Sequence, residues 1–594
     1  MSIFWDPLSL LISFMPLTLL LIKFMPFKNF YIDLSFLENI TINSRKIFIF
    51  ISIFLLIFCV VGAFIFQDPG VEKQGRVLID EFHSNWEDTT TPMNRTWYGM
   101  LSTYNYYNWA KFLDLYYDVN VNLDRPITND LLKNFDILII KCPTTNFSLK
   151  EIDNIINFVR EGGGLLLIGD HSNVFGMNYY LNTISENFGI RFNYDTTYDL
   201  NSLGYSIYRN NRYPQHVILK NLDTIHFLTS CTLEAPFYAE PVILGYGLIA
   251  EPGTYSTPNF VRESSINTDT NFGIFLQSIA LKYGKGRVVA FTDSTCFSNF
   301  CFYMDGYTTF NLGIMNYLNR TNTLDYTNIL LFLGLGLSIP IFLLLKKEKK
   351  EKIILLFIII GLFSTQSSLF LFSHLNQLNY SISEYAQQED ITNICFLQDK
   401  SSFIISPNTV AGSIHEKDHY NTFFVWTQRL GYYPSIEKNL HDSLNIGDAL
   451  VIINPQYIFT DNELKQLLNF IREGGKLLLL GKLENIKSAS AINQIINLFG
   501  ARLNINNETH EVCIENLSSS NPYTNITTEN ISINQQSQLF IIVIENGNGK
   551  IIIAVDSTIF SDYTMGTVFS EPNTFQKKLY EIEYYLFNNV VFKS

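Results

Sequence analysis

The sequence predicts an α/β protein with two doubly wound, parallel-sheet soluble domains and four transmembrane helices. Three observations predict this class. Short apolar strands alternate with amphipathic helices, which favours a parallel sheet with helices on both faces. Long apolar runs occur in two regions of the chain. A strand–helix–glycine turn–strand pattern occurs twice, with Asp136 and Asp448 at the same place in each copy, an offset of 448 − 136 = 312 residues.

The composition limits the class of protein further. A chain of 594 residues is too long for one hydrophobic core, so several domains are expected. Hydrophobic residues make up 47% and charged residues 16%, which favours a membrane protein with large soluble parts. The net charge of −14 argues against nucleic acid as a partner, because phosphates need a basic face. The seven cysteines show no zinc-binding spacing.

Four apolar stretches approach the ~20 residues that cross a bilayer. They cover about 3–27, 47–66, 328–345 and 353–372. The lysine-rich loop Lys346–Lys352 joins the last two, and Lys28, Arg45 and Lys46 lie between the first two. Both loops are expected on the cytoplasmic side. We therefore expect a multi-pass protein of the cytoplasmic membrane whose two large domains are extracytoplasmic.

The expected domain order follows from these spans. Residues 1–66 hold two transmembrane helices and residues 67–326 form the first α/β domain. Residues 327–373 hold two more helices, and residues 374–594 form the second α/β domain. The second domain is expected to be a degenerate repeat of the first.

Four short apolar stretches predict the parallel strands of the first domain. They are Arg76–Asp80, Asp136–Ile140, Leu165–Ile168 and Arg287–Phe291. A helix is predicted to begin at Ser148, because Ser148 and Glu151 have the spacing of a capping box. Its end is predicted at Gly162, where a left-handed residue is favoured. Continuous apolar strands are typical of a sheet that is covered on both faces.

The second domain repeats this pattern. Asp448–Ile452 matches the strand that starts at Asp136, and Thr460–Glu463 is a second capping box. The late Asp-Ser-Thr segment that starts at Asp293 recurs as Asp556–Thr558. The polar cluster that follows the first strand has no clear counterpart near Phe403–Ile405. A match of this length indicates internal duplication into two domains.

Three polar segments follow predicted strands in the first domain. Ligands of open parallel sheets bind outside the carboxyl ends of the strands, so these segments are expected to meet in one crevice. The candidate ligand-binding residues are Asp80, Glu81, His83, Asp170, His171, Ser172, Asn173, Asp293 and Ser294. In the second domain Lys482-Leu483 stands in place of Asp170-His171. A purely structural role should survive duplication more often than a chemical one, which favours function in the first domain.

Two chemical roles remain open for these residues. Histidine and carboxylate side chains are ligands of divalent metals, and the candidate ligands are His83, Asp170, His171 and Asp293. The same kinds of side chain serve as general acids and bases, and the candidates are Asp80, His83, Asp170 and His171. Aspartate and serine after a strand also often cap the next helix. Ser172 lacks the G-x-S-x-G spacing of a hydrolase elbow, so it is a weak nucleophile candidate.

Three segments carry a resemblance to a known superfamily. Asp136–Ile140, the Arg-Glu-Gly-Gly turn with Leu165–Gly169, and Gly284–Asp293 resemble class I glutamine amidotransferase-like domains. They are most similar to the non-catalytic branch, with its DUF4350-type and gliding-motility/intraflagellar-transport-like (GIFT-like) domains. The turn that carries the nucleophilic cysteine in amidotransferases falls in Asp170–Asn173, which has no cysteine. The resemblance implies a binding module, with carbohydrate as a ligand, and not an amidotransferase.

The expected function is that of a cell-envelope membrane protein. Its first extracytoplasmic domain is expected to bind a polar ligand such as a glycan, or a protein partner in the envelope. No cofactor is required for this role. One alternative is a hydrolase of the first domain that uses a divalent metal. A further alternative is an accessory subunit of a transport or export complex.

Overall fold

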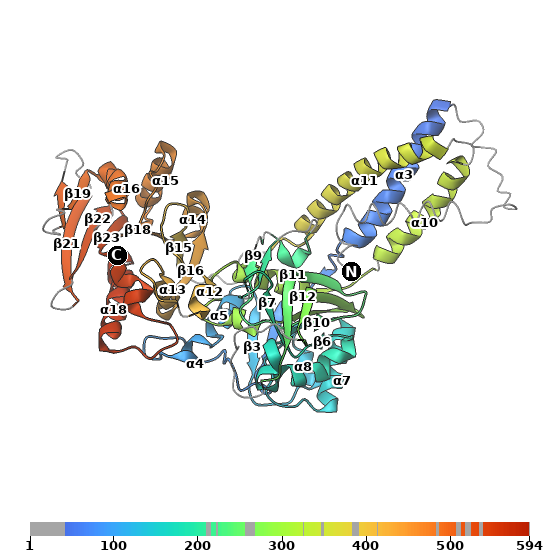
Figure 1. The fold of residues 1–594 in the computed structure, drawn as a ribbon, viewed down its shortest axis with the longest axis horizontal. Helices are drawn as coiled ribbons and strands as arrows, with labels where there is room; N and C mark the ends of the chain where they lie inside the picture. Colours follow the sequence, from blue (N-terminus) through green and yellow to red (C-terminus); the bar gives the residue numbers. More distant parts are fainter. Residues whose placement is uncertain are drawn as a thin grey trace.

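A computed structural model of the chain describes residues 42–592 with short gaps. The gaps are 203, 210–214, 221, 223, 256–267, 325, 346–349, 383–390, 413, 483–485, 506–511, 517–523 and 534–537. The first predicted membrane span, 3–27, lies outside the described residues. Figure 1 shows three long helices that extend away from two α/β units.

The three long helices pack together. They are α3 (Ile42–Ile65), α10 (Tyr326–Leu345) and α11 (Lys350–Asn379). Both α10 and α11 lie against α3. The absence of a side chain at Gly62 permits one close approach, because a Cβ there would lie 2.5 Å from the Phe372 ring. Phe372 in turn packs on Phe58 with 4.7 Å between ring centroids.

One helix among the described residues is long and apolar enough to cross a membrane. It is Ile47–Ile65, which corresponds to the second predicted span. A shorter apolar helix covers Tyr326–Ser338. The predicted topology of four transmembrane helices is therefore not supported by the part of the chain that the structure describes, and the structure gives one candidate span.

The first domain contains a mixed sheet of ten strands. Along its main path the strands are β3 (Asp118–Asn122), β2 (Arg76–Asp80), β4 (Ile137–Lys141), β5 (Gly164–Ile168), β13 (Gly286–Phe291), β12 (Asn271–Tyr283), β10 (Leu233–Glu234) and β6 (Arg191–Phe192). β11 (Glu240–Pro252) pairs with β12 and with β7 (Asp195–Asp199). The four predicted strands are confirmed to within one residue at each end.

The sheet departs from the predicted parallel architecture in its second half. β3, β2, β4, β5 and β13 are mutually parallel, whereas β12 pairs with β13 in the antiparallel direction. The protein is therefore mixed α/β. β11 and β12 contain glycines that interrupt their apolar pattern, such as Gly245 and Gly273, and the pairing of the two strands contains register shifts.

Helices cover both faces of this sheet, because successive side chains of a strand point to opposite faces. Val77 and Ile79 of β2 lie in a core with residues of α5 (Tyr107–Asp114) and α9 (Tyr307–Leu318). Leu78 lies in the opposite core with residues of α7 (Leu149–Glu161) and α8 (Met177–Ser185). The remaining elements of this domain are α4 (Met100–Thr103), α6 (Asn129–Leu132) and the short pairs β1 (Val71–Glu72) with β14 (Arg320–Thr321) and β8 (Ile207–Arg209) with β9 (Thr224–His226).

The predicted start and end of α7 are confirmed. The Ser148 side chain accepts from the Glu151 amide, and the Glu151 side chain accepts from the Ser148 amide. Gly162 ends the helix with a φ of 128°. The sequence could specify both ends because each depends on local residues.

The first six strands of the second domain's sheet have the same order as those of the first domain. Its sheet runs β16 (Tyr433–Glu437), β15 (Asn393–Leu397), β17 (Ala449–Ile453), β18 (Lys476–Gly481), β23 (Gly549–Val555), β22 (Gln538–Asn546) and β21 (Thr524–Ser532). A separate pair is β19 (Ala501–Ile505) with β20 (Val512–Asn516). The helices are α12 (Pro407–Ala411), α13 (Asn421–Trp426), α14 (Leu440–Ile446), α15 (Asp461–Arg472), α16 (Ile486–Ile496), α17 (Asp562–Met565) and α18 (Thr574–Tyr585).

The first strand of this domain lies before the Phe403–Ile405 segment. The counterpart of the first strand is β15, Asn393–Leu397, and not the region of Phe403–Ile405. Ile394–Leu397 is buried throughout, as a central strand requires, whereas Ile404 is 40% exposed and forms an isolated bridge.

The two domains are joined through a continuous apolar core on the α5 and α13 side. Figure 1 places α4 and α5 between the two sheets. Polar contacts cross the same boundary, since Asn108 Nδ2 donates to Gln428 Oε1 at 2.7 Å. The Arg429 guanidinium donates to the Asn94 carbonyl at 2.6 Å and lies 4.0 Å from the centre of the Trp426 ring.

Arg287 at the start of β13 connects the sheet to the long helices. Its guanidinium is buried and donates to the Asp68 carbonyl at 2.8 Å, to the Tyr317 carbonyl at 3.2 Å and to the Tyr380 hydroxyl at 2.9 Å. Asp68 follows α3, and Tyr380 follows α11. The amino-terminal edge of the parallel strands therefore faces the helices.

Replacing Arg287 by methionine tests this connection. The Arg287→Met variant leaves buried acceptors without a donor, so we expect the free energy of unfolding to fall by about 3 kcal/mol. The measurement is thermal and denaturant unfolding of the full chain in detergent. Arg191→Met, at an exposed arginine, is the control and should unfold like the unaltered protein. Equal stability of both variants would contradict the role of Arg287.

Candidate functional site

The candidate site lies at the carboxyl ends of β2, β4, β5 and β13. Parallel pairing aligns Phe291 of β13 with Ile168 of β5, and Ile168 with Lys141 of β4. Asp170 and Asp293 each stand two residues beyond this aligned pair, so the register places them side by side. The structure thus brings together the predicted residues that follow β5 and β13.

Asp170 is held by several hydrogen bonds. One carboxylate oxygen accepts from the His171 amide at 2.6 Å, and the other accepts from the Ser294 hydroxyl. The Asn178 side chain bonds both backbone groups of Asp170. Burial, and then the nearby Asp293 carboxylate, raise the pKa of Asp170 well above its usual value.

Asp293 is fully buried. Its Oδ2 accepts from the amides of Leu228 and Thr229. Its Oδ1 has no hydrogen-bond partner among the described residues. Burial raises the pKa of Asp293 from 3.8 to about 6, although the backbone donors oppose this shift. One oxygen of this buried carboxyl therefore has an unsatisfied hydrogen-bonding capacity in the described part of the chain.

The segment His171–Gly176 covers this pair. Ser172, Asn173 and Phe175 all have φ near 50°, a conformation that side chains other than glycine rarely adopt. Ser172 Oγ is hydrogen-bonded to Thr196 Oγ1, and the Asn173 side chain accepts from the Tyr179 amide at 2.9 Å. The structure thus gives Ser172 a hydroxyl partner in Thr196, which does not add to the case for it as a nucleophile.

His171 is buried beside Asp170. Its Nε2 lies 3.9 Å from Asp170 Oδ1, and its amide donates to the Thr229 carbonyl at 3.1 Å.

The predicted residues after β2 form a separate cluster. The two nitrogens of His83 lie 2.8 Å from Asp80 Oδ2 and 3.2 Å from Glu151 Oε1. The imidazole stacks on Phe147 with 4.0 Å between ring centroids. Asp80 Oδ1 accepts from the Asn122 amide group at 2.8 Å. Both nitrogens of His83 are thus occupied by protein carboxylates.

The second domain repeats this cluster with a lysine in place of the histidine. Lys400 follows β15 as His83 follows β2, and its Nζ lies 2.9 Å from Glu463, the glutamate of the second capping box. The same Nζ lies 5.6 Å from the centre of the Phe459 ring, which takes the place of Phe147. A nitrogen-bearing side chain that joins the first strand to the capping box is present in both domains, which indicates a structural role for His83.

Glu81 also has internal partners. Its Oε1 accepts from the Thr89 amide at 2.8 Å and from its hydroxyl at 2.6 Å, and lies 3.1 Å from Lys141 Nζ. Lys141 is fully buried and also donates to the Glu87 carbonyl at 2.7 Å. These contacts fix the loop after β2 against the end of β4.

The predicted metal ligands do not meet at one point. One group of His, Cys, Asp or Glu side chains in the described part of the chain has ligand atoms within 4.8 Å of one another, namely Glu416, Asp418 and His419 of the second domain. In the first domain His83 pairs with Asp80 and Glu151, whereas Asp170 and Asp293 lie after other strands. The donor set predicted for a divalent metal is therefore divided between two clusters.

Sequence reasoning missed three residues of the crevice. Glu87 is buried with a φ of 60°, and its Oε2 has no hydrogen-bond partner among the described residues. Burial raises the pKa of Glu87 well above its usual value. The Tyr106 hydroxyl donates to the Ser294 carbonyl and lies 3.8 Å from Cys142 Sγ. Burial raises the pKa of the Cys142 thiol, so it is not a thiolate nucleophile.

A signal for two of the missed residues was present in the repeat. Cys142 and Asn454 stand 454 − 142 = 312 residues apart, and both follow a matched strand with φ near 45–49°. Tyr106 and Tyr420 are the residues that precede α5 and α13. In the second domain Asn454 Nδ2 donates to the Tyr420 hydroxyl at 2.9 Å, and Ser557 Oγ donates to Asn454 Oδ1 at 2.7 Å.

Half-buried aromatic side chains pack beside the residues that follow β4 and β5. Trp86 and Phe175 pack together with 5.0 Å between ring centroids. The ring centroids of Trp86 and Tyr104 are 6.3 Å apart. Trp86 and Phe175 also pack on the buried Cys142 and Val174. The site thus combines buried carboxyls with an aromatic cover.

Comparison with known proteins gives a match over part of the chain. The family model described as "IFT52 GIFT domain" matches residues 102–216. This supports the predicted resemblance to a GIFT-type domain in the first soluble unit. No curated protein sequence matches the chain.

Solved structures were also compared with the chain. The "mmIFT52 N-terminal domain" is 14% identical, with 42% of this chain and 99% of that chain covered and a TM-score of 0.28. "Cytoplasmic Protein STM3548 from Salmonella typhimurium" is 14% identical, with 42% and 100% covered and a TM-score of 0.27. "Cytoplasmic Protein STM1381 from Salmonella typhimurium LT2" is 16% identical, with 41% and 98% covered and a TM-score of 0.25.

The structural role of His83 gives the first prediction for the site. His83→Ala leaves two buried carboxyls without their shared partner, so we expect the free energy of unfolding to fall by about 2–3 kcal/mol. Denaturant unfolding of the purified full chain measures the change. His441→Ala, at an exposed histidine of α14, is the control. A His83→Ala protein as stable as this control would refute the structural role.

The raised pKa of Asp293 predicts a pH dependence. A carboxyl whose pKa is about 6 in the folded chain and 3.8 otherwise stabilises the fold fully below pH 3.8. That stability is lost as the pH rises through 6. Asp293→Asn cannot ionise, so its stability should fall less than that of the unaltered chain between these values. Unfolding midpoints across this pH range measure the effect, with Asp153→Asn at an exposed position as the control. Parallel pH profiles for both variants would contradict the assignment.

Proposed function

We propose that the protein is a membrane-anchored protein of the cell envelope whose first α/β domain binds a hydroxyl-rich polar ligand, a glycan, in the crevice after β5 and β13. The observation that carries the proposal is the pair of buried acceptor atoms Asp293 Oδ1 and Glu87 Oε2, which have no partner among the described residues. Buried polar atoms are nearly always hydrogen-bonded, and sugar hydroxyls are donors of suitable size.

The aromatic cover supports the same ligand class. Trp86, Phe175 and Tyr104 are half-buried, and Trp86 packs on the other two rings. Flat aromatic rings provide apolar contact area with little loss of side-chain entropy. Ligand sites commonly combine such rings with a few well-placed polar groups. The strained backbone of Ser172 and Asn173 would favour rearrangement of the covering segment when a ligand enters.

Binding is favoured over catalysis by the state of the candidate nucleophiles. Ser172 Oγ is hydrogen-bonded to Thr196, and the Cys142 thiol has a raised pKa. The alternative of a metal-assisted hydrolase requires His83, Asp170 and Asp293 to act together, and they lie in separate clusters. A protein partner in the envelope remains the alternative ligand, and no described contact favours the role of an accessory transport subunit.

Three finer features belong to the same proposal. We propose that the two domains arose by duplication, which is supported by their common strand order and their two capping boxes. We assign the chain to the DUF4350-type branch of the amidotransferase-like superfamily. We also propose the multi-pass topology with both domains extracytoplasmic, for which the apolar helix Ile47–Ile65 supplies one span.

Titration with soluble glycans tests the function. The full chain in detergent is titrated with a panel of neutral and acidic oligosaccharides by calorimetry. We expect saturable binding to at least one class, and about tenfold or more weaker binding for Asp293→Asn and Trp86→Ala. Tyr238→Ala, at an exposed tyrosine outside the crevice, is the matched control. Metal analysis of the same preparation tests the alternative of a metal-assisted hydrolase. A bound metal that is lost in Asp170→Asn would favour the hydrolase. If a glycan binds saturably and neither Asp293→Asn nor Trp86→Ala weakens it, the crevice is not the binding site.

A further inference from the structure

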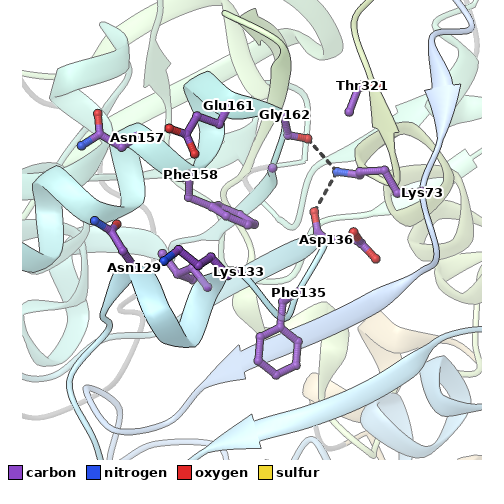
Figure 2. A pocket seen from close by; sticks show the side chains of 12 residues that line it. Lys73, Asn129, Lys133, Phe135, Asp136, Asn157, Phe158, Glu161, Gly162 and Thr321 are labelled. Atoms are coloured by element: carbon purple, nitrogen blue, oxygen red, sulfur yellow. Dashed lines mark hydrogen bonds between the residues drawn. The ribbon is translucent and has the colours of Figure 1, made fainter.

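A polar cavity lies at the end of the first domain's sheet that is opposite to the candidate site. It has a volume of about 540 Å³ and lies beside the starts of β4 and β5, next to Asp136 and Gly162–Gly163. Lys73 and Lys133 line it together with the amides of Asn129 and Asn157 (Figure 2). The pocket lies at the amino-terminal ends of the parallel strands, whereas Asp170 and Asp293 lie beyond their carboxyl ends. The two sites are therefore separate.

Lys73 is the cation inside this pocket. Its Nζ donates to the Asp136 carbonyl at 2.7 Å and to the Gly162 carbonyl at 2.9 Å (Figure 2). These two bonds join the start of β4 to the end of α7. An ammonium group has three N–H donors, so a third donor remains for a ligand.

The charged side chains that line the pocket are the lysines Lys73 and Lys133 and the acids Asp136 and Glu161. Burial lowers the pKa of Lys73 to about 7; Asp136 opposes this shift and Arg287 adds to it. The Asp136 carboxylate is already paired with the Arg76 guanidinium at 3.0 Å. An anion bound beside Lys73 would raise the pKa of its buried ammonium group again, because it would stabilise the charged form. Lys133, paired with Asp130 at 2.9 Å, and Glu161 complete the charged groups at the pocket.

The pocket lies where the chain leaves the long helices. Thr321, which lines the pocket, pairs with Val71 between β1 and β14. Val71 follows the end of α3 at Ile65 by six residues, and α10 begins at Tyr326, five residues after Thr321. Arg287 ties this edge of the sheet to Asp68 and Tyr380 at the ends of α3 and α11. The pocket is therefore on the side of the domain that faces the candidate membrane span.

We propose that this pocket binds the phosphate group of an anionic membrane-lipid headgroup, with Lys73 and Lys133 as the cationic contacts. The amides of Asn129 and Asn157 supply further donors, as phosphate oxygens require. Phe158 and Leu132 form an apolar wall against which the glycerol carbons of a lipid would pack. The inference does not depend on the glycan proposal, because the two sites share no residue.

Short-chain lipids that stay monomeric allow a direct test with the full chain in detergent. Calorimetric titrations compare dihexanoyl phosphatidylglycerol, dihexanoyl phosphatidylcholine and free glycerol 3-phosphate. We expect saturable binding of the anionic lipid, and at least about tenfold weaker binding of the zwitterionic lipid. Free glycerol 3-phosphate should bind more weakly than the anionic lipid, because it lacks the acyl chains. Equal or tighter binding of free glycerol 3-phosphate would overturn the lipid source, and absence of binding by all three would overturn the site.

Two variants link the binding to the pocket. Lys73→Gln and Lys133→Gln should each weaken binding of the anionic lipid by about tenfold, the effect of losing one charge-assisted hydrogen bond. Lys133 is mostly exposed, so its variant tests the site even where Lys73→Gln does not fold. Lys111→Gln, at an exposed lysine of α5, is the matched control and should bind normally. Unchanged affinity in Lys133→Gln would overturn the proposal.

The pH dependence gives an independent readout. Binding of an anion favours protonated Lys73, so the complex takes up a proton above pH 7 and the affinity should fall as the pH rises from 7 to 9. The fall should be absent in Lys73→Gln. An affinity that is constant over this range in the unaltered chain would contradict contact with Lys73.

Discussion

The candidate site depends on the parallel pairing of β5 with β13. This register aligns Ile168 with Phe291, and two aspartates follow at the same distance on adjacent strands. Burial raises the pKa of both carboxyls, and the nearby Asp293 carboxylate raises the pKa of Asp170 further. The surrounding amides of His171, Leu228 and Thr229 offset part of the cost. A shift of one residue in this register would move the two side chains to opposite faces. The pairing of the two strands therefore determines whether the two carboxyls meet.

Comparison of the two domains separates scaffold from site. The bridge from the first strand to the capping box is present twice, once with His83 and once with Lys400, and each of these side chains lies against a phenylalanine. A histidine and a lysine can thus both connect the first strand to the capping-box glutamate. At the end of the next matched strand the domains differ, since Lys482 stands where the first domain has the buried Asp170. The buried acid pair is therefore a property of the first domain, and the cation bridge is a property of the fold.

The sequence predicted the parts of the fold that depend on local residues. The capping box at Ser148, the glycine end of α7 and the apolar strands β2, β4, β5 and β13 all follow from short-range patterns. The antiparallel half of the first sheet could not be predicted, because its strands pair over long distances through irregular, glycine-containing segments. In the site, the sequence identified Asp170 and Asp293, which follow apolar strands. It missed Glu87, whose position depends on a loop with a positive φ, and it grouped His83 with residues that the tertiary structure keeps apart.

The direction of the strands also determines how the two polar sites lie relative to the long helices. All five parallel strands of the first sheet begin at the edge where Arg287 contacts Asp68 and Tyr380, and all end at the crevice. A ligand in the crevice would therefore be held at the end of the domain that faces away from the candidate membrane span. The pocket around Lys73 lies at the near end, where the helix terminus of α7 and the start of β4 present carbonyl groups. A parallel sheet anchored through its amino-terminal edge thus presents the Lys73 pocket toward the helices and the buried aspartates away from them, and this arrangement follows from strand direction.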